Sequence, residues 1–175
     1  LNVIDATCPY VKKIHVIVRE ISKEGTLAII IGEPRHPEVQ GIKGWCFGDV
    51  KVIDTVEEAN NFFTNKKVSI VVQTTQTEEN VDNIMEILKS KLDIKAFYNT
   101  RCSATQDRQQ AAISVAKAVN VMLVIGGKNS SNTKKLALVC QNVGAKVYHV
   151  ETPMEIRMEW FRASDKVGDR KSTRL

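Results

Sequence analysis

An internal repeat constrains this sequence more than any other feature. Three kinds of position recur with the same offset of 94 residues: a cysteine, a glycine that follows a short apolar run, and the start of a polar cluster. An offset kept at three positions indicates two similar units, each of which offers one thiol and one polar loop. The paired positions are Cys8 and Cys102, Gly32 and Gly126, and His36-Pro37-Glu38 and Ser130-Ser131-Asn132.

Short runs rich in valine and isoleucine alternate with helical patterns along the chain. Such runs are typical of parallel strands that are buried on both faces. The regular alternation of strand and helix predicts an α/β fold with parallel sheets, in which the second unit begins near residues 99–101. The predicted strands are Asn2–Asp5, Thr26–Ile31, Lys51–Ile53, Val68–Val72, Ile94–Tyr98, Val121–Ile125 and Lys146–Val150.

Several polar residues match the signals that start helices. A threonine or serine followed three residues later by glutamate or glutamine is a capping box, and a threonine before proline predicts an N-cap followed by a first-turn proline. Pro9 likewise suits a first helical turn, so Cys8 is expected at or beside an N-cap. The other predicted helix starts are Thr55 with Glu58, Thr77, Ser103 with Gln106, and Thr152 with Pro153.

Composition excludes several classes of protein. The net charge is only +5 and aromatic residues make up 6% of the chain, which does not indicate a nucleic-acid-binding surface. Apolar stretches such as Leu27–Ile31 are far too short to span a bilayer, and no charged-then-apolar leader opens the sequence. Widely spaced cysteines without a leader favour the reducing cytosol. We therefore expect a cytoplasmic protein without nucleic-acid or membrane partners.

The two repeated cysteines are candidates for metal binding. Helix N-termini favour the thiolate, which is the form that binds metal or attacks an electrophile. A buried structural cysteine is the alternative at each position, but the repeat makes it less attractive for Cys8 and Cys102. Two thiolates cannot complete a tetrahedral zinc site alone, and the chain contains no Cys-x-x-Cys pair. Two thiolates do suit an iron–sulfur cluster that has further ligands elsewhere.

Other cysteines and histidines fit packing better than chemistry. Cys46 and Cys140 have no counterparts in the repeat, and we interpret both as small core residues. His15 falls within a helical pattern and His149 within a strand pattern, so packing or surface roles are expected for them.

Polar loops follow the predicted strands, at the sheet edge where open α/β folds bind ligands. His36 can hydrogen-bond a phosphate and Glu38 can deliver a proton, although an exposed loop without a ligand is the alternative. The hydroxyls of Thr74 and Thr75 can reach a ligand, or this segment can simply lead into a helix cap. The Gly-rich turn over residues 126–132 precedes a helix and can bind an anion without the spacing of a P-loop.

Together these segments resemble the 4-hydroxy-3-methylbut-2-enyl diphosphate reductase family, which completes the methylerythritol phosphate route to isoprenoids. They occur in the family's order and cover nearly the whole chain up to Gly168, and the set is far more specific than any one segment. The segments are Asp-Ala-Thr-Cys-Pro (5–9), His-Pro-Glu-Val (36–39), Gln-Thr-Thr (73–75), Cys-Ser-Ala-Thr-Gln-x-Arg-Gln (102–109) and Lys-Asn-Ser-Ser-Asn-Thr (128–133).

The resemblance implies three similar α/β domains around one [4Fe–4S] cluster, with one cysteine from each domain. Cys8 and Cys102 would be two of its three protein ligands. The chain would then be a fragment that is not itself a competent reductase, because one cluster thiolate is missing. Its expected parts are the end of a truncated preceding domain (1–6), a second α/β domain (7–99), an incomplete third α/β domain (100–168) and a non-native tail (169–175).

The resemblance also implies roles for the polar loops. Glu38 would deliver a proton, supported by Thr74, and His36 would contact both the proton network and the diphosphate. The substrate would be 4-hydroxy-3-methylbut-2-enyl diphosphate, and the electron donor a protein such as ferredoxin or flavodoxin. The expected substrate-binding residues are His36, Thr74, Thr75, Ser130, Ser131 and Asn132.

Two positions depart from the family's pattern, and two rival functions remain open. Arg101 stands where an apolar residue is usual, and residues 169–175 replace a late motif that contains another phosphate-binding serine. One rival is a hydrolase or transferase that uses Cys8 as nucleophile, which would need a histidine base beside it. The other is a non-catalytic α/β module that binds a phosphorylated ligand.

Overall fold

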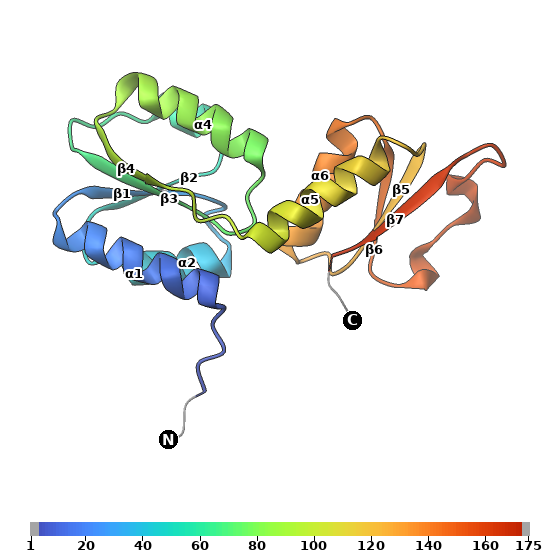
Figure 1. Ribbon diagram of the computed structural model, residues 1–175, viewed down its shortest axis with the longest axis horizontal. Helices are drawn as coiled ribbons and strands as arrows, with labels where there is room; N and C mark the ends of the chain where they lie inside the picture. The colour runs from blue at the N-terminus through green and yellow to red at the C-terminus, as the bar shows by residue number, and fades with distance from the viewer. Residues whose placement is uncertain (1–3, 173–175) are drawn as a thin grey trace. The chain divides into compact units, whose positions relative to one another are not determined.

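The computed structural model describes residues 4–172 (Figure 1). The chain divides into two compact units, Leu1–Cys102 and Ser103–Leu175, so the second unit begins with the helix that follows Cys102. In the part described, no helix has both the length and the apolar character needed to cross a membrane.

The first unit is a four-stranded parallel sheet with helices on both faces. The strand order is β2-β1-β3-β4, so the two central strands are β1 and β3, and every pairing is parallel. All five residues of each central strand are buried, which explains why β1 is wholly apolar and β3 is apolar at every position except Ser69. Its elements are α1 (Pro9–Lys23), β1 (Leu27–Ile31), α2 (Pro37–Gly44), β2 (Val50–Ile53), α3 (Val56–Asn61), β3 (Val68–Val72), α4 (Glu78–Lys91) and β4 (Ile94–Tyr98).

Two apolar cores lie on the two faces of this sheet. Helices α1 and α2 cover one face, where Ile14 and Ile42 are fully buried against Ile30. Helices α3 and α4 cover the other face, where Ile84 packs in one cluster with Ile29. The alternation of Ile29 and Ile30 between the two faces is the period-two pattern of a strand.

The second unit repeats this arrangement with fewer parts. Its parallel sheet has the order β6-β5-β7, and helices α5 and α6 pack on one face through a core that includes Met122 and Leu136. Its elements are α5 (Ser103–Ala116), β5 (Val121–Ile125), α6 (Ser131–Asn142), β6 (Lys146–Val150), two 3₁₀ turns (Pro153–Glu155 and Met158–Trp160) and β7 (Val167–Lys171).

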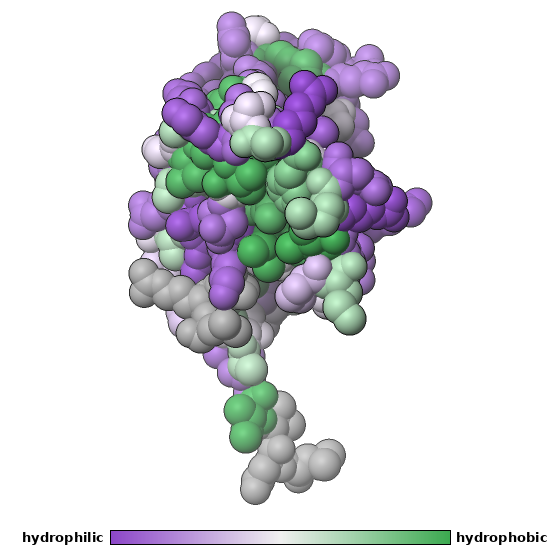
Figure 2. Space-filling view, turned by 90° about the vertical axis from the view of Figure 1, so that its right-hand side faces the viewer, coloured by the Kyte–Doolittle hydropathy of each residue, from purple (hydrophilic) through white to green (hydrophobic). Residues whose placement is uncertain are grey.

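Part of the second unit's surface is apolar. Figure 2 shows apolar residues gathered among hydrophilic ones on one face of the molecule. In this unit the ring of Trp160, in the second 3₁₀ turn, stacks on Tyr148 of β6, with ring centroids 4.0 Å apart. Among the described residues of this unit, the exposed large apolar ones are Leu138, Met154, Ile156, Met158 and Val167.

The fold confirms the α/β class and the repeat. Helices α1 and α2 begin 94 residues before α5 and α6, and β1 lies 94 residues before β5. Four predicted strands have the predicted bounds, and those at Thr26–Ile31 and Lys51–Ile53 shift by one residue at their first end. The strand predicted at Asn2–Asp5 is wrong where it can be checked, because Ile4 and Asp5 are irregular; Asn2 and Val3 lie outside the described residues.

Two predicted helix starts are confirmed and two need correction. Thr55 and Thr77 are N-caps whose side chains accept a backbone N–H, as predicted. α5 begins at Ser103 itself, so this residue is the first of the helix and not the residue before it. Thr152 starts only a three-residue 3₁₀ turn and makes no side-chain cap bond. Met154, just after it, is 94% exposed, so no apolar face is buried that could stabilise a longer helix.

The last strand of the second unit is rich in charged side chains. Residues 167–171 form β7, which pairs in parallel with β5 although Asp169, Arg170 and Lys171 are charged. Backbone hydrogen bonds do not depend on side-chain type, and alternate residues of this strand are exposed. The predicted domain bounds and the non-native origin of residues 169–175 stay predictions.

Candidate functional site

The neighbouring strands β1 and β3 bring two predicted loops together at their carboxyl ends. The segment after β1 leads to His36 and α2, and the segment after β3 contains Thr74. The Glu38 carboxylate accepts the Thr74 backbone N–H at 2.7 Å and the Thr74 hydroxyl at 2.8 Å. Thr74 is 7% exposed, and Glu38 is half-buried. A half-buried carboxylate is therefore held by two donors from one residue of the next strand.

His36 is both a helix cap and a candidate ligand-binding group. Its Nδ1 atom accepts the Glu38 backbone N–H at 3.2 Å, which caps α2. A ring nitrogen that accepts a hydrogen bond carries no proton, so the neutral ring carries its proton on Nε2. This local contact thus makes Nε2 of His36 a hydrogen-bond donor.

Gln73 links the same two loops, and sequence reasoning gave it no role. Its side chain is fully buried, accepts the Glu33 backbone N–H at 2.9 Å and donates to the Thr75 hydroxyl at 3.1 Å. Gly32 permits this approach, because a Cβ added there would lie 2.8 Å from the Gln73 side chain. The sequence offered one sign of this contact. A polar residue directly follows one predicted buried strand, and a glycine directly follows another.

The two candidate cluster ligands have different surroundings. Cys8 is the exposed N-cap of α1, as predicted, and its side chain makes no cap hydrogen bond. The segment before it is tied by Asp5, which accepts the Thr7 N–H at 3.0 Å and pairs with Lys12 at 2.7 Å. These groups hold the pKa of Asp5 far below its usual range.

Cys102 is half-buried, and its thiol is free. Its backbone N–H donates to the Thr74 carbonyl at 3.0 Å, so the residue before α5 is fixed to the end of β3. Free thiols directly before helices are chemically suitable ligands for an iron–sulfur cluster. Over residues 4–172 no group of three or more His, Cys, Asp or Glu side chains could hold a metal ion, so the two thiols fit only as part of such a set.

The predicted polar cluster of the second unit lies at the start of α6. Ser130 caps this helix by accepting the Thr133 N–H at 3.3 Å, and Ser131 is 6% exposed. The Asn132 side chain donates to the Ser172 carbonyl at 3.1 Å, while its Oδ1 atom is buried without a hydrogen-bond partner among the described residues. The structure therefore places all three predicted residues together in one helical turn.

The glycine-rich turn before α6 already holds carboxylates. The Lys128 backbone N–H donates to the Glu151 carboxylate at 2.8 Å, and the Lys128 ammonium pairs with Glu155. Glu155 raises the pKa of Lys128, and Lys128 lowers the pKa of Glu155. Acidic side chains from this unit thus bind where the sequence predicts an anion.

The remaining cysteines and His149 have the packing roles predicted for them. Cys140 is fully buried, and burial raises the pKa of its thiol to about 11. Cys46 is half-buried against the core that α1 and α2 form with the sheet, and burial also raises the pKa of its thiol. His149 lies in β6, where its Nε2 atom is 2.8 Å from the Gly126 carbonyl.

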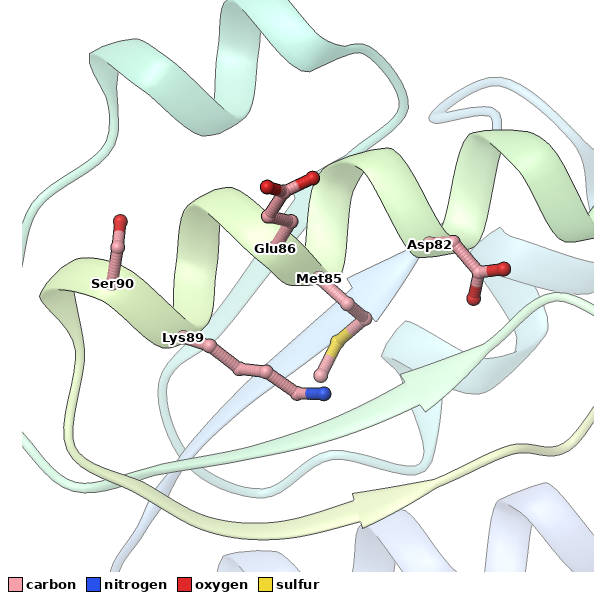
Figure 3. A pocket seen from close by; sticks show the side chains of 5 residues that line it. All are labelled: Asp82, Met85, Glu86, Lys89 and Ser90. Carbon is pink, nitrogen blue, oxygen red and sulfur yellow. The ribbon is translucent and has the colours of Figure 1, made fainter.

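Two surface hollows lie elsewhere in the first unit. Figure 3 shows one of about 540 Å³, which is lined by five residues of α4. The second, of about 510 Å³, lies near α3 and is lined by residues that include Thr55 and Phe62. Neither of these two hollows is lined by a candidate site residue.

His15 lies on α1, close to the helix that carries Glu38. Its ring stacks on Trp45 with ring centroids 5.3 Å apart, and its Nε2 atom is buried without a hydrogen-bond partner among residues 4–172. Burial lowers the pKa of His15 below its usual value of 6.5, although the carboxylates of Asp5 and Glu38 oppose this shift.

The lowered pKa of His15 makes folding stability depend on pH. The unfolded chain binds the proton more readily, so the contribution of His15 is constant above about pH 6.5 and becomes destabilising as pH falls towards its folded pKa. His15→Phe keeps a ring on Trp45 and removes the titration. Urea unfolding at several pH values should show a smaller loss of stability on acidification in this variant. An equal loss in both proteins would contradict the assignment.

Comparison with known proteins supplies the family. The sequence model described as LytB protein matches residues 1–169. A protein of Caldanaerobacter subterraneus subsp. tengcongensis named 4-hydroxy-3-methylbut-2-enyl diphosphate reductase is 44% identical over 168 residues, 96% of this chain and 58% of the relative. A protein of the same name from Geobacter sulfurreducens is 44% identical over 169 residues, 96% of this chain and 60% of the relative.

Solved structures agree with these relatives. The structure of E-1-hydroxy-2-methyl-but-2-enyl-4-diphosphate reductase from Plasmodium falciparum matches with a TM-score of 0.89 and 27% identity, over 96% of this chain and 54% of that chain. A structure of (E)-4-hydroxy-3-methyl-but-2-enyl diphosphate reductase matches with a TM-score of 0.60 and 39% identity, over 99% of this chain and 64% of that chain. The chain thus spans about 60% of the length of the relatives it matches. By sequence and fold, the chain belongs to the LytB protein family.

Proposed function

We propose that this protein acts as a 4-hydroxy-3-methylbut-2-enyl diphosphate reductase. The reaction takes up two electrons and two protons, breaks the bond between carbon and the hydroxyl oxygen, and releases water. Its products are isopentenyl diphosphate and dimethylallyl diphosphate. The names of relatives that are 44% identical over 96% of this chain support this assignment.

One observation carries the proposal, which is the hydrogen-bonded pair of Glu38 and Thr74. The Thr74 N–H and hydroxyl fix both oxygens of the Glu38 carboxylate, at 2.7 and 2.8 Å. A carboxyl group in a fixed position can pass a proton to a leaving hydroxyl, and a threonine hydroxyl can donate or accept as the proton moves. Glu38 is therefore the proposed proton donor, with Thr74 as its partner.

Donors near this pair suit a diphosphate. His36 presents Nε2–H because Nδ1 accepts the Glu38 N–H, and the Thr75 hydroxyl, next to Thr74 in the chain, accepts from Gln73. Within the second unit, Ser130, Ser131 and Asn132 lie at the start of α6, where helix N–H groups favour anions. We propose these residues as the donors that bind the diphosphate oxygens.

We propose that Cys8 and Cys102 bind a [4Fe–4S] cluster together with a further ligand. Both thiols are free and stand directly before helices, and cysteine is the residue that holds such clusters. When bound, the cluster would supply the electrons and a Lewis-acidic iron for the substrate hydroxyl. A ferredoxin or flavodoxin in the cytoplasm is the proposed electron source.

The assay uses a protein of the relatives' full length that contains this sequence. After reconstitution with iron and sulfide without oxygen, we expect it to oxidise reduced viologen when 4-hydroxy-3-methylbut-2-enyl diphosphate is added. Isopentenyl diphosphate, which lacks the hydroxyl, is the matched control and should give no oxidation. Equal rates with both diphosphates, or none from a protein that holds its cluster, would contradict the proposal.

A further inference from the structure

The chain continues to follow β3 after β4 has ended. The last pair of the β3–β4 ladder joins Val71 and Tyr98. Beyond it, the Val72 backbone N–H donates to the Thr100 hydroxyl at 2.8 Å, and the same hydroxyl donates to the Val72 carbonyl. Two residues later, the Cys102 N–H donates to the Thr74 carbonyl at 3.0 Å. The Thr100 side chain thus replaces a peptide group in a ladder that reaches Cys102.

Thr100 is suited to this position because a hydroxyl can both donate and accept. Val72 is fully buried, so without the hydroxyl its N–H and carbonyl would lose a partner out of reach of water. Serine can make the same two contacts, whereas valine has the same shape and can make neither.

Thr74 connects this ladder to the proposed proton donor. Its carbonyl accepts the Cys102 N–H, while its own N–H and hydroxyl donate to Glu38. Thr74 therefore holds both the backbone of Cys102, which is a proposed cluster ligand, and the carboxylate of Glu38. Cys8 differs, because the segment before it is held by contacts of the exposed Asp5.

Arg101 holds the same segment from another direction. Its side chain is 5% exposed, donates to Asn99 at 3.0 Å and lies 3.6 Å from the carboxylate of Glu78 at the start of α4. The side chains of Thr100 and Arg101 thus tie the residues before Cys102 to β3 and to α4.

We propose that Thr100 is a positioning residue for Cys102, which it holds in register with Thr74 and Glu38 for cluster binding. The link to the cluster rests on the proposed function, but the position of Cys102 can be tested without it. Loss of the Thr100 hydroxyl should weaken the hydrogen bond of the Cys102 amide. It should also shorten the lifetime of a bound cluster.

The first test is hydrogen exchange of the Cys102 amide in this chain, measured by nuclear magnetic resonance. Thr100→Val should speed exchange by about tenfold, as expected when a buried hydrogen bond is lost, and Thr100→Ser should not. Thr26→Val is the matched control, because the Thr26 hydroxyl donates to the Ile21 carbonyl at 3.2 Å far along the chain from Cys102. Thr100→Ala provides a second variant that lacks the hydroxyl. Unchanged exchange of the Cys102 amide in both Thr100→Val and Thr100→Ala would overturn the proposal.

The second test measures cluster loss to a chelator in the full-length protein without oxygen. Thr100→Val should lose its cluster several-fold faster than the parent, while Thr100→Ser and Thr26→Val should match it. Faster amide exchange with unchanged cluster loss would overturn the link between Thr100 and the cluster. A parent protein that takes up no cluster would instead overturn the proposed function, and the exchange result would still decide whether Thr100 positions Cys102.

Discussion

Replacing Glu38 with glutamine should lower turnover by about 10²–10⁴-fold, the usual contribution of a positioned acid or base. Glutamine keeps the size of the side chain and one oxygen that can accept the Thr74 N–H, which Glu38 accepts at 2.7 Å. It cannot deliver a proton, so cluster content and diphosphate binding should persist while viologen oxidation is lost. The measurements are the iron content, the binding of the substrate and the rate of turnover.

Glu58→Gln is the matched control for this prediction. Glu58 also lies in the first turn of a helix, and its carboxylate accepts the Asp54 backbone N–H at 2.7 Å. Its substitution should leave turnover near that of the parent. Unchanged turnover in Glu38→Gln would remove Glu38 from the proton pathway, and a loss of cluster in that variant would indicate a structural role instead.

Replacing either Cys8 or Cys102 with serine should remove most of the bound iron. Changes to groups that merely support a metal ligand cost about 10–100-fold in affinity, so loss of a thiolate ligand should cost more. The expected result is a colourless protein whose iron and sulfide contents fall together after reconstitution. Cys46→Ser is the control, because Cys46 is half-buried against an apolar core.

The two ligand variants should keep their folding stability. The Cys102 amide is bound to Thr74, whose side chain and N–H bind Glu38. Serine at position 102 keeps this backbone contact, so folding stability should change little in either variant. Full iron content in Cys8→Ser or Cys102→Ser, with normal absorption, would exclude that cysteine as a ligand.

Much of the fold could be predicted because it depends on residues that are close together in the sequence. Runs rich in valine and isoleucine such as Val68–Val72 have the observed bounds, since a central strand is buried on both faces. The caps at Thr55 and Thr77 depend only on residues three positions away. The prediction at Thr152 failed because a cap signal cannot reveal whether the following residues will bury a face.

The site could be predicted only in part. The repeat and the motifs predicted Glu38 and Thr74 as candidates, and the neighbouring strands β1 and β3 bring these two side chains into contact. The roles of Gln73 and Thr100 were missed, because they depend on which loop lies opposite each side chain. A local sequence pattern cannot show such a long-range contact, whereas the order of the strands in the sheet can.

The most direct measurement of the central claim is identification of the reaction products. The full-length protein, reconstituted with iron and sulfide and supplied with reduced viologen, would be given 4-hydroxy-3-methylbut-2-enyl diphosphate, and the diphosphates would be separated and identified by mass spectrometry. The account predicts isopentenyl and dimethylallyl diphosphate from the parent and almost none from Glu38→Gln. Recovery of unchanged substrate from a parent protein that holds its cluster would contradict it.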